Sequence, residues 1–261
     1  MTFRSQAKWT AAVMFVLIPG AQSVSASVLA AKRNYLEDHS YLVGIVLGVA
    51  FAAAAVAEAY LAKVRAAKLQ AFAIALGGSY HRRANEADAA LPDGCSLASI
   101  GGGRKVSNIL EAVRTPELAF TLFDYEYTMG KSTREQTISR MESSLLHLPS
   151  FVLFPETIFF KLGEKIVERK DIDFSDSPVF SEAFVLRGKD EPAIRTLFSA
   201  KLRQALEATP DLMIEGNAER LFIFRENYRC KPEEFSPAVE RDKRILALFF
   251  EAQAGNAPAA I

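Results

Sequence analysis

The stretch 120–137, FTLFDYEYTMGKSTREQT, decides how the fold is predicted, because it joins an aromatic run to a short stretch built around one glycine. Side chains of an extended strand alternate between two faces. One face would then carry Thr121, Phe123, Tyr125 and Tyr127. The other would carry Phe120, Leu122, Asp124 and Glu126. We expect the aromatic face to be core and the two acids to face solvent.

The Gly-Lys-Ser-Thr that follows resembles the end of a phosphate-binding loop, but the motif is incomplete. Such a loop needs a glycine five residues before Gly130, where Tyr125 stands. Residues 134–138 begin a second strand-like run. The pattern therefore predicts a hairpin loop over Met129 to Thr133.

Further strands and helices are predicted on both sides of this hairpin. Apolar alternation and turn residues predict strands over 105–113, 117–128, 134–146, 151–155, 183–187, 211–215 and 220–224. The last two would be joined at Gly216-Asn217. Helices are expected over 156–168, over 192–208 and from Ser236-Pro237 onward. Strands followed by helix, hairpin and helix indicate an α+β domain with a mainly antiparallel sheet and two packed helices.

Two uncharged segments precede this domain. Residues 9–31 and 41–57 contain no charged side chain, and the second run extends past Glu58 to about residue 62. About 22 helical residues span roughly 33 Å, which matches a hydrocarbon core of about 30 Å. The second segment is therefore predicted to be a transmembrane helix, and we expect it to continue to Gly77-Gly78, a pair suited to a helix C-terminus.

The first segment has two interpretations. Arg4 and Lys8 before an apolar run, with small residues at 24–26, are typical of a cleaved signal peptide, and the same residues fit the first helix of a transmembrane hairpin. In both cases Lys63, Arg65 and Lys68 follow the second segment without an acid among them. This cationic excess favours a cytoplasmic soluble domain.

Charge, cysteine and histidine content exclude several classes of function. The chain carries 31 Lys plus Arg and 31 Asp plus Glu, and beyond residue 70 the balance is 24 to 28. Without a polybasic block, nucleic acid is not an expected partner. Cys95 and Cys230 are expected to be unpaired thiols, and the three histidines lie far apart. No metal or cofactor is expected.

Clustered carboxylates are the candidate chemical groups. Asp124 and Glu126 would project from one face of a strand about 7 Å apart. Asp171 and Asp173, with Ser175 and Glu182, have calcium-loop spacing, but Asp176 replaces the glycine of the sharp turn, so a cap or turn role is favoured. The triple glycine 101–103 lacks the preceding strand and third glycine of a dinucleotide-binding loop and is interpreted as a flexible connection.

An ordered series of short motifs gives the chain a resemblance to a known family. The motifs are GGGRKVSNILEA (101–112), FDYEYT (123–128), LPSFVLFPE (148–156), DIDF (171–174) and FVLRGKDEPAIRTLF (184–198). The stretch from about 100 to 225 resembles uncharacterised bacterial membrane-anchored proteins with a C-terminal domain of unknown function. The resemblance implies a bacterial, membrane-anchored protein, and it supplies no activity, cofactor or catalytic residue.

These features define the expected organisation and function. We expect a membrane region over 1–70, with segments 9–31 and 41–62, a soluble α+β domain over 71–253 and a flexible tail over 254–261. The protein would lie in the bacterial inner membrane, in contact with the lipid bilayer. Its domain would bind a protein partner or the membrane surface as a non-enzymatic binding or scaffold domain. A membrane-tethered hydrolase that uses Asp124, Glu126 or the Asp171 cluster is the alternative, and a small-ligand sensor is a third possibility.

Overall fold

A computed structural model of the chain describes residues 40–85, 88–158 and 171–255. The chain divides into two compact units, Met1–Arg65 and Ala66–Ile261, and each is treated by itself. The predicted segment 9–31 and most of the predicted helix 156–168 lie outside the described residues; residues 156–158 are helical.

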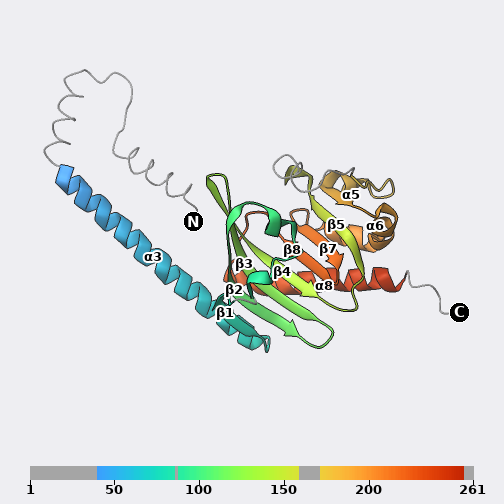
Figure 1. The fold of residues 1–261 in the computed structure, drawn as a ribbon, viewed down its shortest axis with the longest axis horizontal. Helices are drawn as coiled ribbons and strands as arrows, with labels where there is room; N and C mark the ends of the chain where they lie inside the picture. The colour runs from blue at the N-terminus through green and yellow to red at the C-terminus, as the bar shows by residue number, and fades with distance from the viewer. Residues whose placement is uncertain (1–39, 86–87, 159–170, 256–261) are drawn as a thin grey trace, which may run out of the picture. The chain divides into compact units, whose positions relative to one another are not determined.

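The first described element is helix α3, Ser40–Ala75 (Figure 1). Its large side chains up to Leu61 are exposed, and Phe51, for example, is 72% exposed. Within the described part of the chain, residues 41–75 form a helix long and apolar enough to cross a membrane. This finding agrees with the prediction for the second apolar segment.

The last turns of α3 belong to the second unit. Leu69 and Ala73 are buried in its main hydrophobic core. The helix ends where the sequence predicts, because Gly77 adopts a positive φ of 70° and the amide of Gly78 donates to the carbonyl of Ala73 at 2.9 Å. A Cβ on Gly78 would collide with the backbone carbonyl of Glu111, so chain packing also requires a glycine there.

The second unit is built on one eight-stranded antiparallel sheet, with the strand order β1-β2-β3-β4-β8-β7-β5-β6. The strands are β1 Ser79–Arg83, β2 Gly102–Arg114, β3 Ala119–Met129, β4 Ser132–Glu142, β5 Leu148–Pro155, β6 Phe184–Gly188, β7 Met213–Ala218 and β8 Arg220–Phe224. Helices α5 Pro178–Ala183, α6 Glu191–Leu197, α7 Ala200–Glu207 and α8 Phe235–Ala254 follow or separate the later strands. The predicted α+β class with a mainly antiparallel sheet is confirmed.

The β3–β4 hairpin confirms the interpretation of the opening stretch. The two strands pair without interruption from Ala119 opposite Glu142 to Met129 opposite Ser132. The connection has two residues, Gly130 and Lys131, and Gly130 has a φ of 63°. A glycine with positive φ at the first position of a two-residue loop is typical of the hairpin turns that match strand twist.

Three local predictions differ from the structure. Residues 192–208 form two helices, because the Ser199 hydroxyl caps α7 by accepting the amide of Leu202 at 3.3 Å. The β7–β8 turn lies after Gly216, which pairs with Leu221 and leaves room for the Phe151 ring. The glycines 101–103 are not a free connection, because a Cβ on Gly101 would collide with the carbonyl of Thr128.

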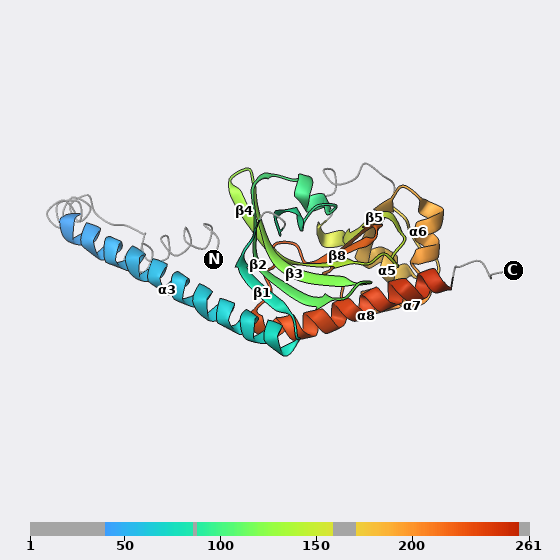
Figure 2. The ribbon, with the colours of Figure 1, turned by 60° about the horizontal axis from the view of Figure 1, so that its bottom comes forward.

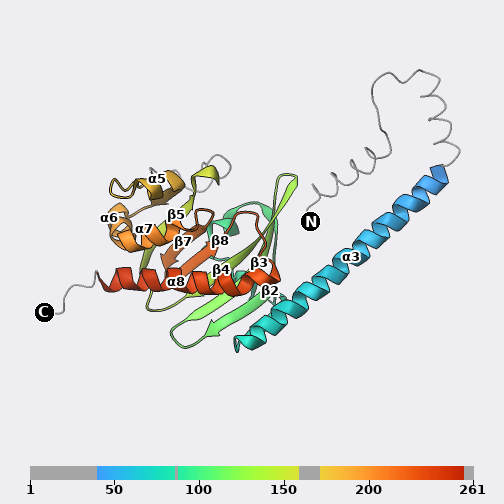
Figure 3. The same ribbon diagram turned by 180° about the vertical axis from the view of Figure 1, so that it is seen from behind.

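The two faces of the sheet are covered by different elements (Figures 2 and 3). Helix α8 lies along one face, where it contributes Phe235, Ile245 and Phe249 to the main core. The opposite face is covered by the segment that carries the short 3-10 helices Asp88–Ala90 and Ser96–Ser99. That second core contains Cys95, Leu97, Ile109, Phe123, Tyr125, Tyr127, Ile138, Phe154, Val185, Met213, Phe222 and Phe224. The aromatic face of β3 is therefore core, as predicted.

Candidate functional site

Asp124 lies in the interior, and the expectation that it faces solvent is wrong. Asp124 is 5% exposed, because the face of β3 that carries Phe120 and Leu122 is also buried. A carboxylate removed from water is stable only if hydrogen-bond donors or cations replace its hydration. The surroundings of Asp124 supply both.

Three donors from three parts of the fold reach the Asp124 carboxylate. Asn108 of β2 donates its Nδ2 to Oδ2 at 2.9 Å, and Thr137 of β4 donates its hydroxyl to Oδ1 at 2.6 Å. The loop after β8 supplies Arg229, whose Nε donates to Oδ2 at 2.8 Å. This set of Asn108, Asp124, Thr137 and Arg229 is called the Asp124 network below.

The Asp124 network extends to the edge strand and to the loop before α8. The Tyr80 hydroxyl of β1 donates to Oδ1 of Asn108 at 2.7 Å, and the Cys230 amide donates to the Thr137 hydroxyl at 3.0 Å. Asn108 has a φ of 51°, in a stretch where the β2–β3 register shifts. Asparagine tolerates this conformation better than most residues. The network therefore ties β1, β2, β3, β4 and the 225–231 loop together.

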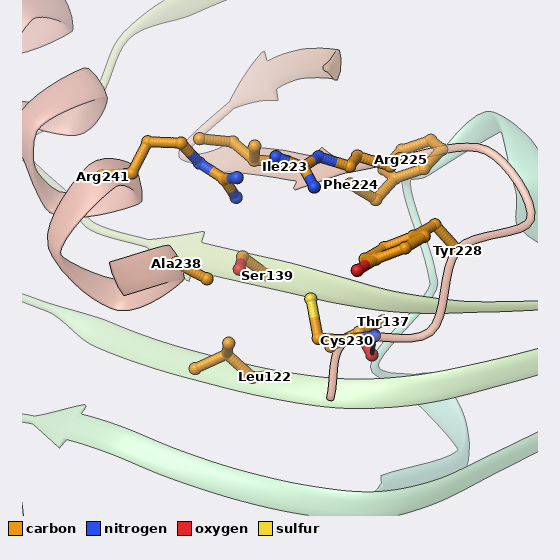
Figure 4. A pocket seen from close by; sticks show the side chains of 10 residues that line it. All are labelled: Leu122, Thr137, Ser139, Ile223, Phe224, Arg225, Tyr228, Cys230, Ala238 and Arg241. Atoms are coloured by element: carbon orange, nitrogen blue, oxygen red, sulfur yellow. Dashed lines mark hydrogen bonds between the residues drawn. The ribbon is translucent and has the colours of Figure 1, made fainter. Parts of the chain in front are cut away.

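A narrow pocket lies beside this network (Figure 4). It is lined by Leu122, Thr137, Ser139, Ile223, Phe224, Arg225, Tyr228, Cys230, Ala238 and Arg241. Arg225 and Arg241 lie on one side, and Cys230 with Thr137 lies opposite. The cavity volume of about 10 Å³ is the space of roughly one water molecule, so a substrate does not fit.

Both arginines of the pocket have carboxylate partners. Arg241 contacts Asp242 at 2.8 Å, and Arg225 contacts Asp211 at 2.8 Å. Asp242 is fully buried and also accepts the Ser139 hydroxyl at 2.5 Å. Burial raises the pKa of Asp242, and Arg241 and Ser139 partly offset that rise. The sequence analysis missed Asp242 because it stands among charged residues of an amphipathic helix.

Glu126 does not join the Asp124 network. It lies in register with Lys105 of β2 and Glu135 of β4 and is half-buried. The two acids share a strand, as the sequence suggests, and the structure does not bring them into one site.

Asp171 and Asp173 also have separate surroundings. The Asp171 Oδ1 accepts the amides of Ile172 at 2.8 Å and Leu186 at 2.7 Å, an arrangement that holds the chain against β6. Burial raises the pKa of this carboxyl group. Asp173 lies in an open hollow with Ser175, Glu182 and Arg195. Across residues 40–85, 88–158 and 171–255, no group of His, Cys, Asp and Glu side chains could hold a metal ion.

Glu215 is a second buried carboxylate that the sequence analysis missed. It lies on β7 facing the second core, where the Ser96 amide donates to it at 2.6 Å and the Ser96 hydroxyl at 2.5 Å. Burial raises the pKa of Glu215, and the Ser96 hydrogen bonds partly offset that effect. Ser96 and Glu215 are 119 positions apart, so no local pattern could have paired them.

The raised pKa of Glu215 predicts a pH-dependent stability difference. A carboxyl with a raised folded-state pKa contributes most below its unfolded pKa of about 4.3, and that contribution is lost as pH rises through the folded pKa. We therefore expect the wild-type protein to lose melting temperature relative to Glu215→Gln as pH rises from about 4 to about 8. Asp242 and Asp171 are present in both proteins and cancel in the difference. A difference that is constant with pH would contradict the prediction.

Among the described side chains, Ser79 Oγ lies 3.4 Å from Nε2 of the exposed His81, but the serine hydroxyl donates to Oε2 of Glu111 at 2.9 Å. Burial raises the pKa of the Cys95 thiol well above its usual value and also raises that of Cys230, so both thiols are poor nucleophiles. Neither Cys95 nor Cys230 forms a disulfide bond within the described residues. The Ser181 hydroxyl is bound to the backbone of Phe174. The buried carboxylates of Asp124, Glu215 and Asp242 act as hydrogen-bond acceptors within the fold.

Comparisons with known proteins identify a distant structural likeness. No protein-family model matches the chain, and no curated protein matches it. The crystal structure of the mycobacterial trehalose monomycolate transport factor A, TtfA, is similar with a TM-score of 0.49 and 9% sequence identity, over 75% of this chain and 98% of that chain. A likeness of this size carries no functional argument, and the family resemblance noted from the sequence stays a prediction.

Proposed function

We propose that the chain is a membrane-anchored protein whose domain after α3 is a non-enzymatic binding or scaffold domain on the cytoplasmic side of the bacterial inner membrane. The exposure of the apolar surface of α3 is the observation that carries this proposal. Residues 41–75 would extend about 52 Å, more than a hydrocarbon core of about 30 Å. Exposing so much apolar surface to water costs roughly 25 cal/mol per Å², whereas a bilayer removes that cost.

The proposed organisation has three parts. The membrane region covers 1–70, the soluble domain covers 71–253, and a tail covers 254–261. Leu69 and Ala73 are core residues of the second unit, so the end of α3 serves both as the anchor's last turns and as part of the domain.

The hydrogen bonding of the buried Asp124 carboxylate within the fold supports a binding role. Asp124, one of the carboxylate candidates from the sequence, accepts hydrogen bonds from Asn108, Thr137 and Arg229. The pocket beside the Asp124 network is too small to enclose a substrate. Because the buried polar groups of the domain bind one another, we expect the domain to bind a partner through its surface.

The open hollow beside α5 supports the alternative, a membrane-tethered hydrolase. Asp173 and Glu182 both line it, and the guanidinium of Arg195 donates to the Asp173 carbonyl at 2.7 Å. Two carboxylates could act as acid and base on a bound water. Hydrolysis of an ester or phosphodiester panel that is lost in Asp173→Asn and retained in Asp124→Asn would favour this alternative.

Topology reporters test the proposed location. The cations Lys63, Arg65 and Lys68 should hold the end of the membrane segment on the cytoplasmic side. We expect a C-terminal green fluorescent protein fusion to be fluorescent in the membrane fraction after carbonate washing, and a matched alkaline phosphatase fusion to be inactive. High phosphatase activity would overturn the side assigned here, and release by carbonate would overturn the anchor.

A further inference from the structure

Exposed cations line the side of the sheet between the end of β1 and the β3–β4 turn. β1 ends with Arg82 and Arg83, and Arg83 is in register with Ser107 of β2. β2 begins beside the β3–β4 turn, since Gly102 is in register with Thr128. The end of β1, the start of β2 and the β3–β4 turn therefore follow one another along one side of the sheet, from Arg83, level with Asp124 in the middle of β3, to the turn after Met129. Its cations, called the basic corner, are Arg82, Arg83, Arg104, Lys105 and Lys131.

The cations of the basic corner lie on the surface of the domain. All five are exposed, and none forms a salt bridge with another residue of the described ranges 40–85, 88–158 and 171–255. Arg104 donates to the Gly101 carbonyl at 3.2 Å, which leaves its charge uncompensated. Many other arginines do have carboxylate partners; examples are Arg114, Arg134, Arg140, Arg195, Arg203, Arg220, Arg225, Arg229 and Arg241.

Few acids lie at this corner. Glu126 is in register with Lys105 and is half-buried. Glu135 lies opposite Glu126 and contacts Arg229 at 3.6 Å, and Asp88 accepts the amide of Asn85 in the segment that follows β1. Glu86 lies outside the described residues. Beyond residue 70 the chain has more acids than bases, 28 to 24, so a local excess of cations gives the domain a strongly uneven charge distribution. A domain with such a charge distribution is oriented by the electrostatic field of a charged surface.

We propose that the basic corner binds the anionic phospholipid headgroups of the bilayer in which α3 is anchored. This inference rests on the proposed membrane anchor. Three residues separate the end of α3 at Ala75 from the start of β1 at Ser79, so the anchor holds this part of the domain at a high effective concentration near the bilayer surface. Lysine and arginine near a negatively charged leaflet are attracted within about a Debye length, roughly 8–10 Å at ordinary ionic strength.

The observations favour lipid over nucleic acid as the occupant. Attraction of a polyanion by five cations supplies no base recognition by itself. An acidic domain as a whole is repelled by a long polyanion, whereas a planar anionic surface can be approached through one corner alone.

The test uses the full-length protein in lipid nanodiscs. A donor dye is attached to Ser132→Cys, beside the basic corner, in a Cys230→Ala background, and an acceptor is carried by labelled lipid headgroups. Discs contain either phosphatidylcholine alone or phosphatidylcholine with about one third phosphatidylglycerol. We expect roughly twofold higher energy transfer in the anionic discs, and we expect about 0.5 M salt to remove the difference.

Matched variants assign the effect to the basic corner. Arg82→Gln/Arg83→Gln should lower the lipid-dependent part of the transfer at least twofold. Lys189→Gln/Arg244→Gln removes two other exposed cations, one after the opposite edge strand and one on α8, and should leave the transfer unchanged. Melting curves of both variants should match that of the parent protein.

Several results would overturn the inference. Equal transfer in neutral and anionic discs, or an equal loss in the control variant, would show that the corner does not bind lipid. An anisotropy response to a single-stranded oligonucleotide that only Arg82→Gln/Arg83→Gln removes would assign the corner to nucleic acid. Failure of the protein to enter discs at all would instead contradict the proposed anchor.

Discussion

Replacement of Phe123 by alanine is expected to lower the free energy of unfolding by about 3–5 kcal/mol. The ring is fully buried in the second core, which is made largely of aromatic and aliphatic side chains. Truncation removes apolar contacts and leaves a cavity that a close-packed sheet cannot collapse around. A domain of this size is stabilised by about 5–15 kcal/mol, so the Phe123→Ala variant should lose a large part of its free energy of unfolding.

Denaturant melts of the full-length protein in mild detergent would measure this effect. Tyr125→Ala should cost a similar amount, because Tyr125 is also buried, stacks on Tyr127 at 5.9 Å and donates to the Leu97 carbonyl at 3.3 Å. Val179→Ala is the control; this side chain is 62% exposed, and the change should stay within about 0.5 kcal/mol. A loss below about 1 kcal/mol at Phe123 would show that the aromatic face is not core.

The elements with strong local signals were predictable from the sequence. The α3 apolar run, its stop at the glycine pair and the β3–β4 hairpin around Gly130 follow from composition and turn chemistry. β1 was not predicted, because its sequence, Ser79–Arg83, has three cationic or titratable side chains in succession and no apolar alternation. Its pairing with β2 depends on non-local backbone hydrogen bonds that no short pattern encodes.

The candidate site was predictable only in part. The sequence assigns Asp124 to the correct face of β3, together with Phe120 and Leu122, and the expectation of solvent there failed because α8 and the 225–231 loop belong to distant parts of the chain. Arg229 stands 105 positions after Asp124. The one available signal was that Phe120 and Leu122, which precede Asp124 on this face, are apolar, as is typical of a central strand buried on both sides.

The same network makes Asp124 the position where the second large effect is expected. Asp124→Ala should lower the free energy of unfolding by about 2–4 kcal/mol, because Asn108, Thr137 and Arg229 lose their common acceptor. The Arg229 side chain is 37% exposed, so water can replace part of its interaction with Asp124. The expected loss of stability is therefore smaller than for a fully buried ion pair. Asp124→Asn keeps one acceptor oxygen and should cost about 1–2 kcal/mol.

Glu126 supplies the matched control two residues along the same strand. Because it is half-buried and outside the network, Glu126→Gln should change stability by no more than about 0.5 kcal/mol. In a double-mutant cycle, Asp124→Ala and Arg229→Ala should be non-additive by about 1 kcal/mol or more, whereas Glu126→Gln and Arg229→Ala should be additive. Additivity of the first pair together with a stability loss below about 0.5 kcal/mol for Asp124→Ala would contradict a structural role. Asp124 would then be a buried acid that does not stabilise the fold, and this result would favour the hydrolase alternative.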